Sequence, residues 1–563
     1  MQIIRQPKVY DVCIVGSGAG GGMAAKVLCE AGADVVMLEA GPMWDAATDS
    51  KMSAWSYDSP RRGAATPSKP FGEFDGCLGG WDIDGEPYTQ AAGSTFDWFR
   101  GRMLGGRTNH WGRISLRFGP YDFRRRSLDG LGDDWPITYD DLKPYYDKVD
   151  TLIGLFGTKE GLPNEPDGIF QPPPKPRCYE LFVKQACDRL RVTCIPSRLS
   201  ILTKSLNGRA ACHYCGQCGR GCTTASNFSS SQVLLPPAMK TGKLTLITGA
   251  MAREILVSKD GRAEGVSYVD KATRSEKRVN ARAVVVAASA CESARLLLNS
   301  KSSAFPDGIA NSSGTVGRYL TDSVGSDGHG HIPALEKIPP HNHDGVGGMH
   351  MYVPWWKFDR KNDFPRGYHI EFGGGPSMPG VGMFDGLCHD EEGYGAKLKQ
   401  RARQVYGTYI GFSGRGEMLP NPDTYCEIDP DVVDQWGIPV LRFHFRWTDY
   451  ELLQAKDMQE TFRAIVEAMG GEYRTKSSIH GEYPFGIQKG GKIIHEVGTA
   501  RMGADPKTSV VNGFCQAHDV KNLFVTDGAP LVTNPDKNPT LTIMALAWRA
   551  SDYLLEEAKK GNL

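Results

Sequence analysis

A glycine-rich turn between two apolar segments constrains this chain more than any other feature of its sequence. Residues 9–15 are a run of mostly β-branched apolar residues, typical of a buried strand, and residues 23–31 have the composition of a helix that stops at Gly32. Residues 33–38 are a second, mostly apolar run that ends in Glu39. The sequence therefore predicts a complete βαβ unit at this end of the chain.

The turn has the pattern G-x-G-x-x-G, with glycines at Gly16, Gly18 and Gly21. The first glycine permits a tight turn, the second lets a pyrophosphate approach the backbone, and the third lets helix and strand pack closely. Glu39 lies 23 residues after Gly16, where a carboxylate accepts hydrogen bonds from both ribose hydroxyls and repels a 2′-phosphate. The unit predicts a dinucleotide site, and by itself it leaves NAD and FAD as alternatives.

Three later segments carry a family resemblance. They are residues 102–112 (RMLGGRTNHWG), residues 495–503 (HEVGTARMG), and residues 522–528 with 538–542 (NLFVTDG and NPTLT). Together with the glycine turn, and in this order, they resemble the glucose–methanol–choline (GMC) oxidoreductases. The resemblance spans nearly the whole chain. Within the family the chain looks similar to pyranose 2-oxidase, to the catalytic subunits of bacterial FAD-dependent glucose dehydrogenases and to glucoside 3-dehydrogenases.

The resemblance implies FAD as the cofactor and an α/β fold, α+β overall. A discontinuous Rossmann-like FAD domain is expected beside a substrate domain whose antiparallel sheet covers the isoalloxazine. The expected FAD-domain parts are 1–125, 206–325 (with a cysteine-rich loop) and 489–563, the connecting segment is 126–205, and the substrate domain is 326–488.

Apolar periodicity outside the first unit predicts further elements. Strands are expected at 244–247, 253–257, 283–288 and 523–526, and helices at 452–469 and 540–555. Residues 325–450 contain short alternating stretches such as 440–447, which we interpret as one antiparallel sheet, and residues 41–100 are expected to be mostly loop.

The flavin-binding positions follow from the turn and from the resemblance. Gly105 and Gly106 allow a loop to lie flat along the cofactor, Asp527 and Gly528 end a strand, and residues 538–540 begin the last helix, whose free N–H groups can stabilise negative charge on reduced flavin. The expected FAD contacts are Gly16, Ser17, Gly18, Ala19, Gly21, Glu39, Gly105, Gly106, Thr108, Asn109, His110, Ala252, Asp527, Gly528, Asn538, Pro539 and Thr540. His110 occupies the position of a covalent histidyl–flavin bond in pyranose 2-oxidase, and the alternative is a histidine that only packs beside the flavin.

Oxidation of an alcohol carbon requires a base for the hydroxyl proton and an acceptor for the hydride. A neutral histidine suits the first task near pH 7. The resemblance implies that His495 is this base and that Asn538, 43 residues later, orients the same hydroxyl. Hydride would pass to flavin N5.

Four cysteines lie within eleven residues, in the spacing C-x₂-C-x₂-C-x₃-C. They are Cys212, Cys215, Cys218 and Cys222, and their spacing is that of ferredoxin ligands, except that Thr223 replaces the usual proline. We therefore predict an iron–sulfur cluster. Zinc and reduced or disulfide-bonded thiols are the alternatives, and a second ligand pair, as structural zinc usually takes, is absent from this run.

The nuclearity of the cluster stays open between [3Fe–4S] and [4Fe–4S]. Three ligands give [3Fe–4S], which the resemblance to glucose dehydrogenases implies. Cys222, or one of the remote cysteines Cys178, Cys187 and Cys194, would complete [4Fe–4S].

Charge and hydropathy limit the partners. The 65 basic and 65 acidic residues cancel, so nothing electrostatic favours nucleic acid or an anionic membrane, and no apolar run is long enough to span a bilayer. Residues 1–8 lack the apolar stretch of a signal peptide. The resemblance implies export to the periplasm with a small partner subunit that carries a Tat signal, with the cytoplasm as the alternative.

These observations predict a dehydrogenase that oxidises a secondary or anomeric hydroxyl of a sugar or glycoside and passes electrons through the cluster to an acceptor such as cytochrome c. The aromatic and polar residues of 340–375 suit sugar stacking and hydrogen bonding. The alternative is an FAD oxidase of pyranoses, long-chain alcohols or sterols that reduces O₂ without a functional cluster.

Overall fold

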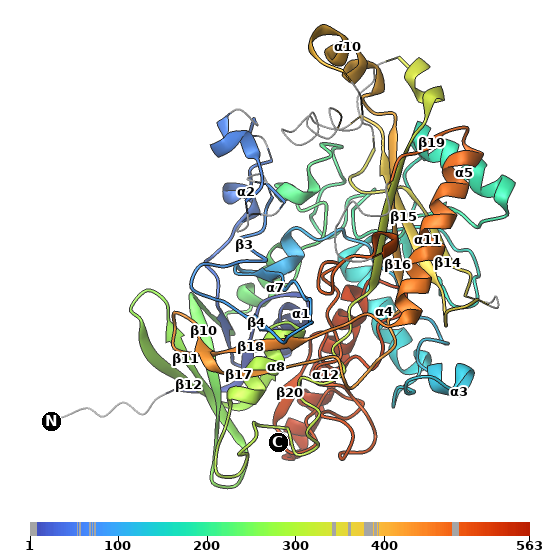
Figure 1. Cartoon of the computed structure of the whole chain (residues 1–563). Coiled ribbons are helices and arrows are strands. Elements are labelled where there is room, and N and C mark those ends of the chain that lie inside the picture. The colour runs from blue at the N-terminus through green and yellow to red at the C-terminus, as the bar shows by residue number, and fades with distance from the viewer. Residues whose placement is uncertain are drawn as a thin grey trace.

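The computed structural model describes the chain except for residues 1–7, 53, 56–57, 67–68, 70, 73–74, 340–344, 359–361, 377–386, 388–390, 392 and 476–483. Within the described part, no helix is both long and apolar enough to cross a membrane. Two large sheets organise the molecule, one mostly parallel and one antiparallel, and helices pack against them (Figure 1).

The first sheet has the predicted βαβ unit at its centre, and α1 (Ala19–Glu30) connects its two strands. The helix begins inside the glycine run rather than at Met23, because these glycines already form its first turn. The parallel strands are, in spatial order, β20 (Leu523–Val525), β12 (Ser275–Val286), β1 (Val9–Val15), β2 (Val35–Glu39) and β9 (Leu244–Thr248). Strands of one sheet thus come from three distant parts of the chain, as expected for a discontinuous domain.

An antiparallel extension lengthens this sheet on one side. β10 (Ala250–Val257) pairs with β11 (Ala263–Asp270), and β11 pairs with the first half of β12. Asn280 of β12 is opposite Val9 of β1 on one side and Gly265 of β11 on the other, so the long strand joins both parts. β11 is not expected from the sequence, because its apolar run is interrupted by Gly265.

The second sheet is antiparallel throughout, and α11 (Asp449–Ala468) packs on one face of it (Figure 1). Its order is β19 (Glu472–Tyr473), β13 (Val324–His331), β16 (Tyr409–Gly416), β15 (Tyr368–Gly374), β14 (Met351–Trp356) and β8 (Ile195–Pro196). Glycines bring the helix close: a Cβ at Gly414 would lie 2.4 Å from Sδ of Met458. The opposite face is therefore the one available for a ligand.

One part of the predicted antiparallel sheet lies elsewhere. β17 (Tyr425–Val433) and β18 (Pro439–His444) form a hairpin, and β18 pairs in parallel with β4 (Thr89–Gln90) in a separate three-stranded sheet. Residues 325–450 therefore do not form a single sheet. Alternation shows that a strand exists but not which strand it pairs with.

Helices account for the remaining packing. α12 (Thr540–Lys560) continues beyond the predicted residue 555 and packs against α1 and α4 (Tyr139–Ile153). α11 starts earlier than predicted because Thr448 and Glu451 form a capping box. The sequence does not predict α4, α5 (Cys178–Leu190), α8 (Ala290–Asn299) or α10 (Gly395–Val405).

The other described elements are short, and the described part of the region 41–100 contains only such elements, as expected. They are α2 (Ala46–Asp49), η2 (Pro60–Gly63), β3 (Gly79–Gly80), β5 (Arg100–Gly101), η3 (Gly106–Asn109), α3 (Arg125–Asp129), β6 (Leu155–Phe156), β7 (Phe170–Gln171), η4 (Cys218–Arg220), α6 (Ser230–Val233), α7 (Leu235–Lys240), η5 (Pro333–Lys337) and η6 (Pro484–Gly486).

Candidate active site

A cavity of about 470 Å³ lies where β1 and β2 end and the glycine turn enters α1. Packing requires two of the glycines: a Cβ at Gly16 would lie 2.3 Å from the carbonyl oxygen of Ala287, and one at Gly21 would lie 2.0 Å from that of Gly16. A Cβ at Gly18 would meet nothing within 4 Å, and Gly18 lines the cavity. The turn thus divides the roles of its glycines as a dinucleotide fingerprint requires.

Glu39 reaches the same cavity from the end of β2, and protein groups hold its carboxylate. Oε2 accepts hydrogen bonds from the Ser17 hydroxyl and N–H, and Oε1 accepts one from the Gly41 N–H at 2.8 Å. Burial raises the pKa of Glu39, while these hydrogen bonds oppose the shift. α1 begins without a side-chain cap, so its N-terminus suits an anionic group in the cavity.

The second predicted segment folds over this turn. Gly105 has a φ of 84°, and its N–H donates to Ser17 Oγ at 2.9 Å, which fixes the loop on the glycine turn. Asn109 is buried and donates to the carbonyl of Leu104 at 2.8 Å. Of the predicted FAD contacts, Gly21, Gly105 and Asn109 shape the wall without lining the cavity, whereas Gly106, Thr108, His110 and Ala252 line it.

The C-terminal segment also lines the cavity. Asp527, Gly528, Pro539 and Thr540 line it together with Ser17 and Ala19. The Asp527 carboxylate accepts from the N–H groups of Ser289 (3.0 Å) and Ala529 (2.8 Å), which fixes the turn after β20. α12 begins at Thr540 without a side-chain cap. A second helix N-terminus therefore meets the cavity.

His495 and Asn538 lie side by side at the edge of this cavity. Nε2 of His495 is 3.3 Å from Nδ2 of Asn538, although the residues are 43 positions apart. Nδ1 of His495 is 2.9 Å from Oγ of Ser323. Burial, followed by the charge of Arg415, lowers the pKa of His495 to about 3, so its ring is neutral near pH 7.

Glu371 of β15 also lies at this site, although it was not expected from the sequence. Its Oε1 accepts from Nδ2 of Asn538 at 3.4 Å and lies 3.0 Å from Nε2 of His369, while Arg415 Nη2 is 3.8 Å from Oε2. Burial favours its neutral form, but Arg415 and His369 outweigh it and lower the pKa of Glu371 to about 2. The alternation of 368–374 places His369 and Glu371 on one face, but sequence alone does not show which face meets a ligand.

A second cavity, of about 580 Å³, lies over the free face of the antiparallel sheet and shares Gly112 and Ile114 with the first. Gly373 and Gly411 line it from the centre of this face. Its polar lining residues are Asp327, His329, Glu371, Ser413 and Thr475, and its apolar lining includes Ile114, Leu199 and Met349. Glu371 therefore connects the His495–Asn538 pair to a cavity with polar and apolar walls.

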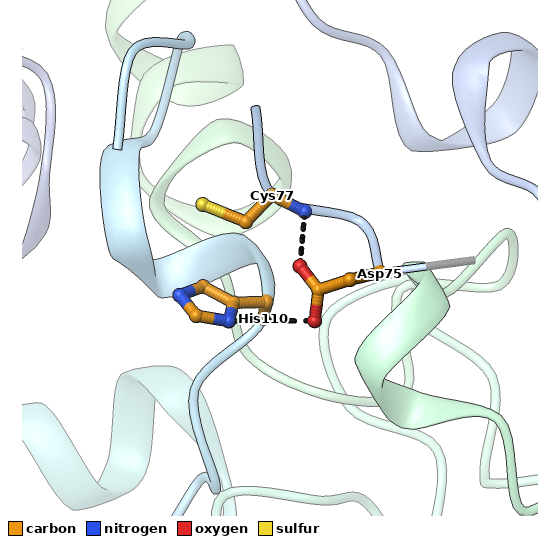
Figure 2. Close-up of side chains that lie close together, drawn as sticks. All are labelled: Asp75, Cys77 and His110. Atoms are coloured by element: carbon orange, nitrogen blue, oxygen red, sulfur yellow. Dashed lines mark hydrogen bonds and ion pairs between the residues drawn. The ribbon is translucent and has the colours of Figure 1, made fainter. Parts of the chain in front are cut away.

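His110 lines the first cavity close to Asp75 and Cys77 (Figure 2). Its Nδ1 is 3.6 Å from Asp75 Oδ2, and the Cys77 N–H donates to Asp75 Oδ1 at 2.7 Å. Burial opposes protonation, but Cys77 and Asp75 outweigh it and raise the pKa of His110 to about 10. The ring is thus held as a cation at the cavity edge, and a covalent bond to flavin stays a prediction.

The four cysteines of the predicted cluster lie on a loop around η4 that packs against this edge. The Gly76 N–H donates to the carbonyl of Gly219 at 2.7 Å. Among the described residues, no three of the four sulfurs lie within 4.8 Å of one another, whereas tetrahedral zinc, with Zn–S of about 2.3 Å, brings its sulfurs to about 3.8 Å apart. The loop as folded here does not form a zinc site.

The thiols of the loop differ in their pKa, because burial raises the pKa of Cys212 and Cys215. Cys212 Sγ accepts from the Tyr214 N–H at 3.4 Å and Cys215 Sγ from the Gln217 N–H at 3.5 Å. Backbone and Thr224 hydrogen bonds outweigh burial and lower the pKa of Cys222. Of the remote cysteines, Cys187 and Cys194 hydrogen-bond to each other and Cys178 is exposed. Nothing in these contacts brings a remote cysteine to the loop.

Comparison with known proteins gives a consistent result. The N-terminal and C-terminal GMC oxidoreductase family profiles match residues 19–324 and 420–547. The 2-methyl-1,2-propanediol dehydrogenase of Mycolicibacterium austroafricanum is 30% identical over 97% of this chain and 95% of that protein. The fructose dehydrogenase large subunit of Gluconobacter japonicus is 26% identical over 98% of each chain. Pyridoxine 4-oxidase from Mesorbium loti shares the fold, with a TM-score of 0.61 and 18% identity over 97% of this chain and 99% of that one.

Proposed function

Because this chain belongs to the GMC oxidoreductase family of FAD-dependent enzymes that act on alcohol or sugar donors, we propose that it oxidises a secondary or anomeric hydroxyl of a sugar or glycoside. One observation carries the proposal: His495 and Asn538 converge at the edge of the nucleotide cavity and, through Glu371, meet the second cavity.

The residues of the first cavity fit FAD. Gly18 leaves space for a pyrophosphate, two uncapped helix N-termini meet the cavity, and Glu39 stands where a ribose is bound. When bound, FAD would supply a two-electron acceptor for the hydride, and an iron–sulfur cluster held by the cysteine loop would supply one-electron transfer to an external acceptor such as cytochrome c. Gly106, Thr108, Asp527 and Pro539 would complete the FAD site.

His495 acts as the base. Asn538 Nδ2 can only donate, so Nε2 of His495, which faces it, carries the lone pair, and the Nδ1 proton points to Ser323. A substrate hydroxyl between the two groups would donate to Nε2 and accept from Nδ2. The same oxygen is thereby oriented and deprotonated, while burial keeps water from competing.

The second cavity supports a sugar as substrate. Asp327, Glu371 and Ser413 offer acceptors and a hydroxyl on one wall, and Ile114, Leu199 and Met349 offer an apolar surface. A pyranose has the same division between hydroxyl-bearing edges and C–H faces. A purely aliphatic substrate would offer no hydrogen-bonding groups to the polar wall formed by Asp327, Glu371 and Ser413, which favours a sugar over a long-chain alcohol or sterol.

We extend the proposal to electron transfer. The cysteine loop, beside the cavity edge at His110, would hold the cluster through Cys212, Cys215, Cys218 and Cys222, and the enzyme would be a dehydrogenase rather than an oxidase. A relative described as a large subunit favours work with partner subunits. We propose a small Tat-signal subunit and a periplasmic location, which co-expression and cell fractionation would test.

A single preparation tests the function. The purified protein should show a flavin spectrum, contain iron, and oxidise a glucose or glycoside substrate with a dye acceptor faster than with O₂, while His495→Gln abolishes both activities. A preparation that stays colourless after addition of FAD would contradict the proposal. Fast peroxide formation without iron would favour the oxidase alternative.

A further inference from the structure

The cavity face of the antiparallel sheet carries two glycines directly opposite each other. Gly373 of β15 pairs with Gly411 of β16, and Gly411 in turn pairs with His329 of β13. Both members of this glycine pair line the second cavity, where Gly373 is exposed and Gly411 is half-buried. A glycine inside a strand weakens the sheet because it has no side chain to pack, so two of them in one row call for a reason.

Packing within the protein does not supply that reason. On the helix side of the same sheet it does, since a Cβ at Gly330 would lie 2.5 Å from Cγ1 of Val466. A Cβ at Gly411 would have only ordinary contacts, with carbonyl oxygens at 3.9 and 4.0 Å, and a Cβ at Gly373 would meet no described atom within 4 Å. Neither member of the glycine pair has a positive φ. Close approach of a ligand to the backbone accounts for such a bare strand surface.

The row of side chains next to the glycine pair faces the catalytic residues. It consists of Asp327, Ser413 and Glu371, which pair with one another across β13, β16 and β15. Glu371 accepts a hydrogen bond from Nδ2 of Asn538 at 3.4 Å. Two residues of a strand span about 7 Å, so the glycine pair lies roughly one sugar ring further from Asn538 than Glu371 does.

The catalytic end of this surface holds a polar atom that requires a ligand. Asn538 is only 7% exposed, and its Oδ1 has no hydrogen-bond partner within the described part of the chain. A buried acceptor without a donor is unfavourable, and a second hydroxyl of the sugar, beside the one that is oxidised, would supply the donor. A sugar ring held in this way at Asn538 leaves the glycine pair for a group attached to the ring.

The rest of the cavity lining suits an apolar group. Ile114, Leu199 and Met349 line the same cavity, and each is at least nine-tenths buried. We propose that Gly373 and Gly411 are specificity-determining residues, and that the bare strand surface receives the flat, apolar aglycone of a glycoside. The inference rests on the proposed function and narrows it: a glycoside has no free anomeric hydroxyl, so the hydroxyl that is oxidised is a secondary one. The oxidation itself is the one proposed above.

Two substrates that differ only in the aglycone test the inference. Methyl β-glucoside carries a small aglycone and phenyl β-glucoside a flat ring, and both have the same sugar hydroxyls. For the FAD-loaded enzyme with a dye acceptor, we expect kcat/KM to be at least about ten-fold higher for the phenyl than for the methyl glucoside. Gly373→Val should remove this preference by raising KM for the phenyl glucoside alone. It should keep the FAD content and the melting temperature, because β-branched residues suit strands.

Glu264→Val is the control. It places a valine at an exposed position of β11, outside the lining of both cavities, and should alter kcat/KM for neither glucoside. Gly411→Ala is the second test variant, and it should lower the preference for the phenyl glucoside in the same direction as Gly373→Val. If Gly373→Val loses FAD, Gly411→Ala decides by the same criterion.

The outcomes separate this inference from the function it rests on. Equal kcat/KM for the two glucosides in wild type, or equal losses for both in Gly373→Val, would overturn the inference and leave the oxidation in place. If neither glucoside is oxidised, the proposed function fails, and calorimetric titration with phenyl β-glucoside decides on the glycine pair. Binding to wild type that is lost in Gly373→Val supports the inference, and absence of binding to wild type contradicts it.

Discussion

Glu371 determines which way the amide of Asn538 faces. The carboxylate of Glu371 can only accept, because its pKa is lowered to about 2, and it takes a hydrogen bond from Nδ2 of Asn538 at 3.4 Å. The same Nδ2 lies 3.3 Å from Nε2 of His495, which must then carry its lone pair. A residue of the antiparallel sheet thus sets the tautomer of a base on a segment more than a hundred residues later.

Substitution of Glu371 should therefore impair catalysis more than binding of the cofactor. Glu371→Gln offers Asn538 both a donor and an acceptor, so the amide can turn and present Oδ1 to His495. We expect the rate of flavin reduction by substrate to fall about ten- to hundred-fold, the value of one or two lost hydrogen bonds to charged groups. Stopped-flow absorbance of the flavin measures it. Glu427→Gln, a substitution on the solvent-exposed side of β17, should leave the rate unchanged; equal losses in both variants would contradict the role.

Ser323 should affect catalysis only by orienting the ring of His495. Its hydroxyl oxygen lies 2.9 Å from Nδ1 of His495 and accepts from Asn534 Nδ2 at 3.3 Å. Ser323→Ala removes both of these buried hydrogen bonds, and we expect about a ten-fold lower kcat with little change in KM. Steady-state kinetics with a dye acceptor test this. A variant that loses FAD would show a structural role instead, which flavin absorbance detects in the same sample.

The pH dependence of flavin reduction should lack the usual histidine inflection. Burial and Arg415 hold the pKa of His495 near 3, so the ring stays neutral and able to accept a proton as the pH falls from 8 to 5. A histidine with its ordinary pKa of about 6.5 would instead lose most of its activity as a base over this range. We expect a flat rate between pH 5 and 8 in anaerobic stopped-flow measurements. A rate that falls with an apparent pKa near 6.5 would contradict the assignment.

The sequence predicts the chemistry of this molecule better than its architecture. The glycine turn, Glu39, His495 and Asn538 belong to local motifs whose residue order is tied to the chemistry, so their proximity could be expected. The proximity of Glu371 and Arg415 could not be predicted from the sequence. Each residue lies on an ordinary alternating strand, and the two come together only because β15 pairs with β16. The β17–β18 hairpin was predicted in the wrong sheet for the same reason. Its partner strand β4 lies more than three hundred residues away in the sequence, so alternation gave no sign of the pairing. Asp75 and Cys77, which lie close to His110, belong to a stretch without periodicity.

The glycines of the turn allow the cofactor and the fold to be separated experimentally. A Cβ at Gly21 would lie 2.0 Å from the Gly16 carbonyl, so Gly21→Ala must push α1 from the sheet. We expect it to lower the free energy of unfolding by about 1–3 kcal/mol, as for other overpacked sites.

Gly18→Ala is the matched variant. The new Cβ would have no protein atom within 4 Å, Gly18 has an ordinary negative φ, and the methyl group would lie only where the pyrophosphate would approach. It should therefore keep the thermal stability of the FAD-free chain and lose FAD affinity, as measured by differential scanning fluorimetry and flavin titration. Equal loss of stability in the two FAD-free variants would mean that Gly18 serves packing, and undiminished FAD affinity in Gly18→Ala would remove the turn from the cofactor site.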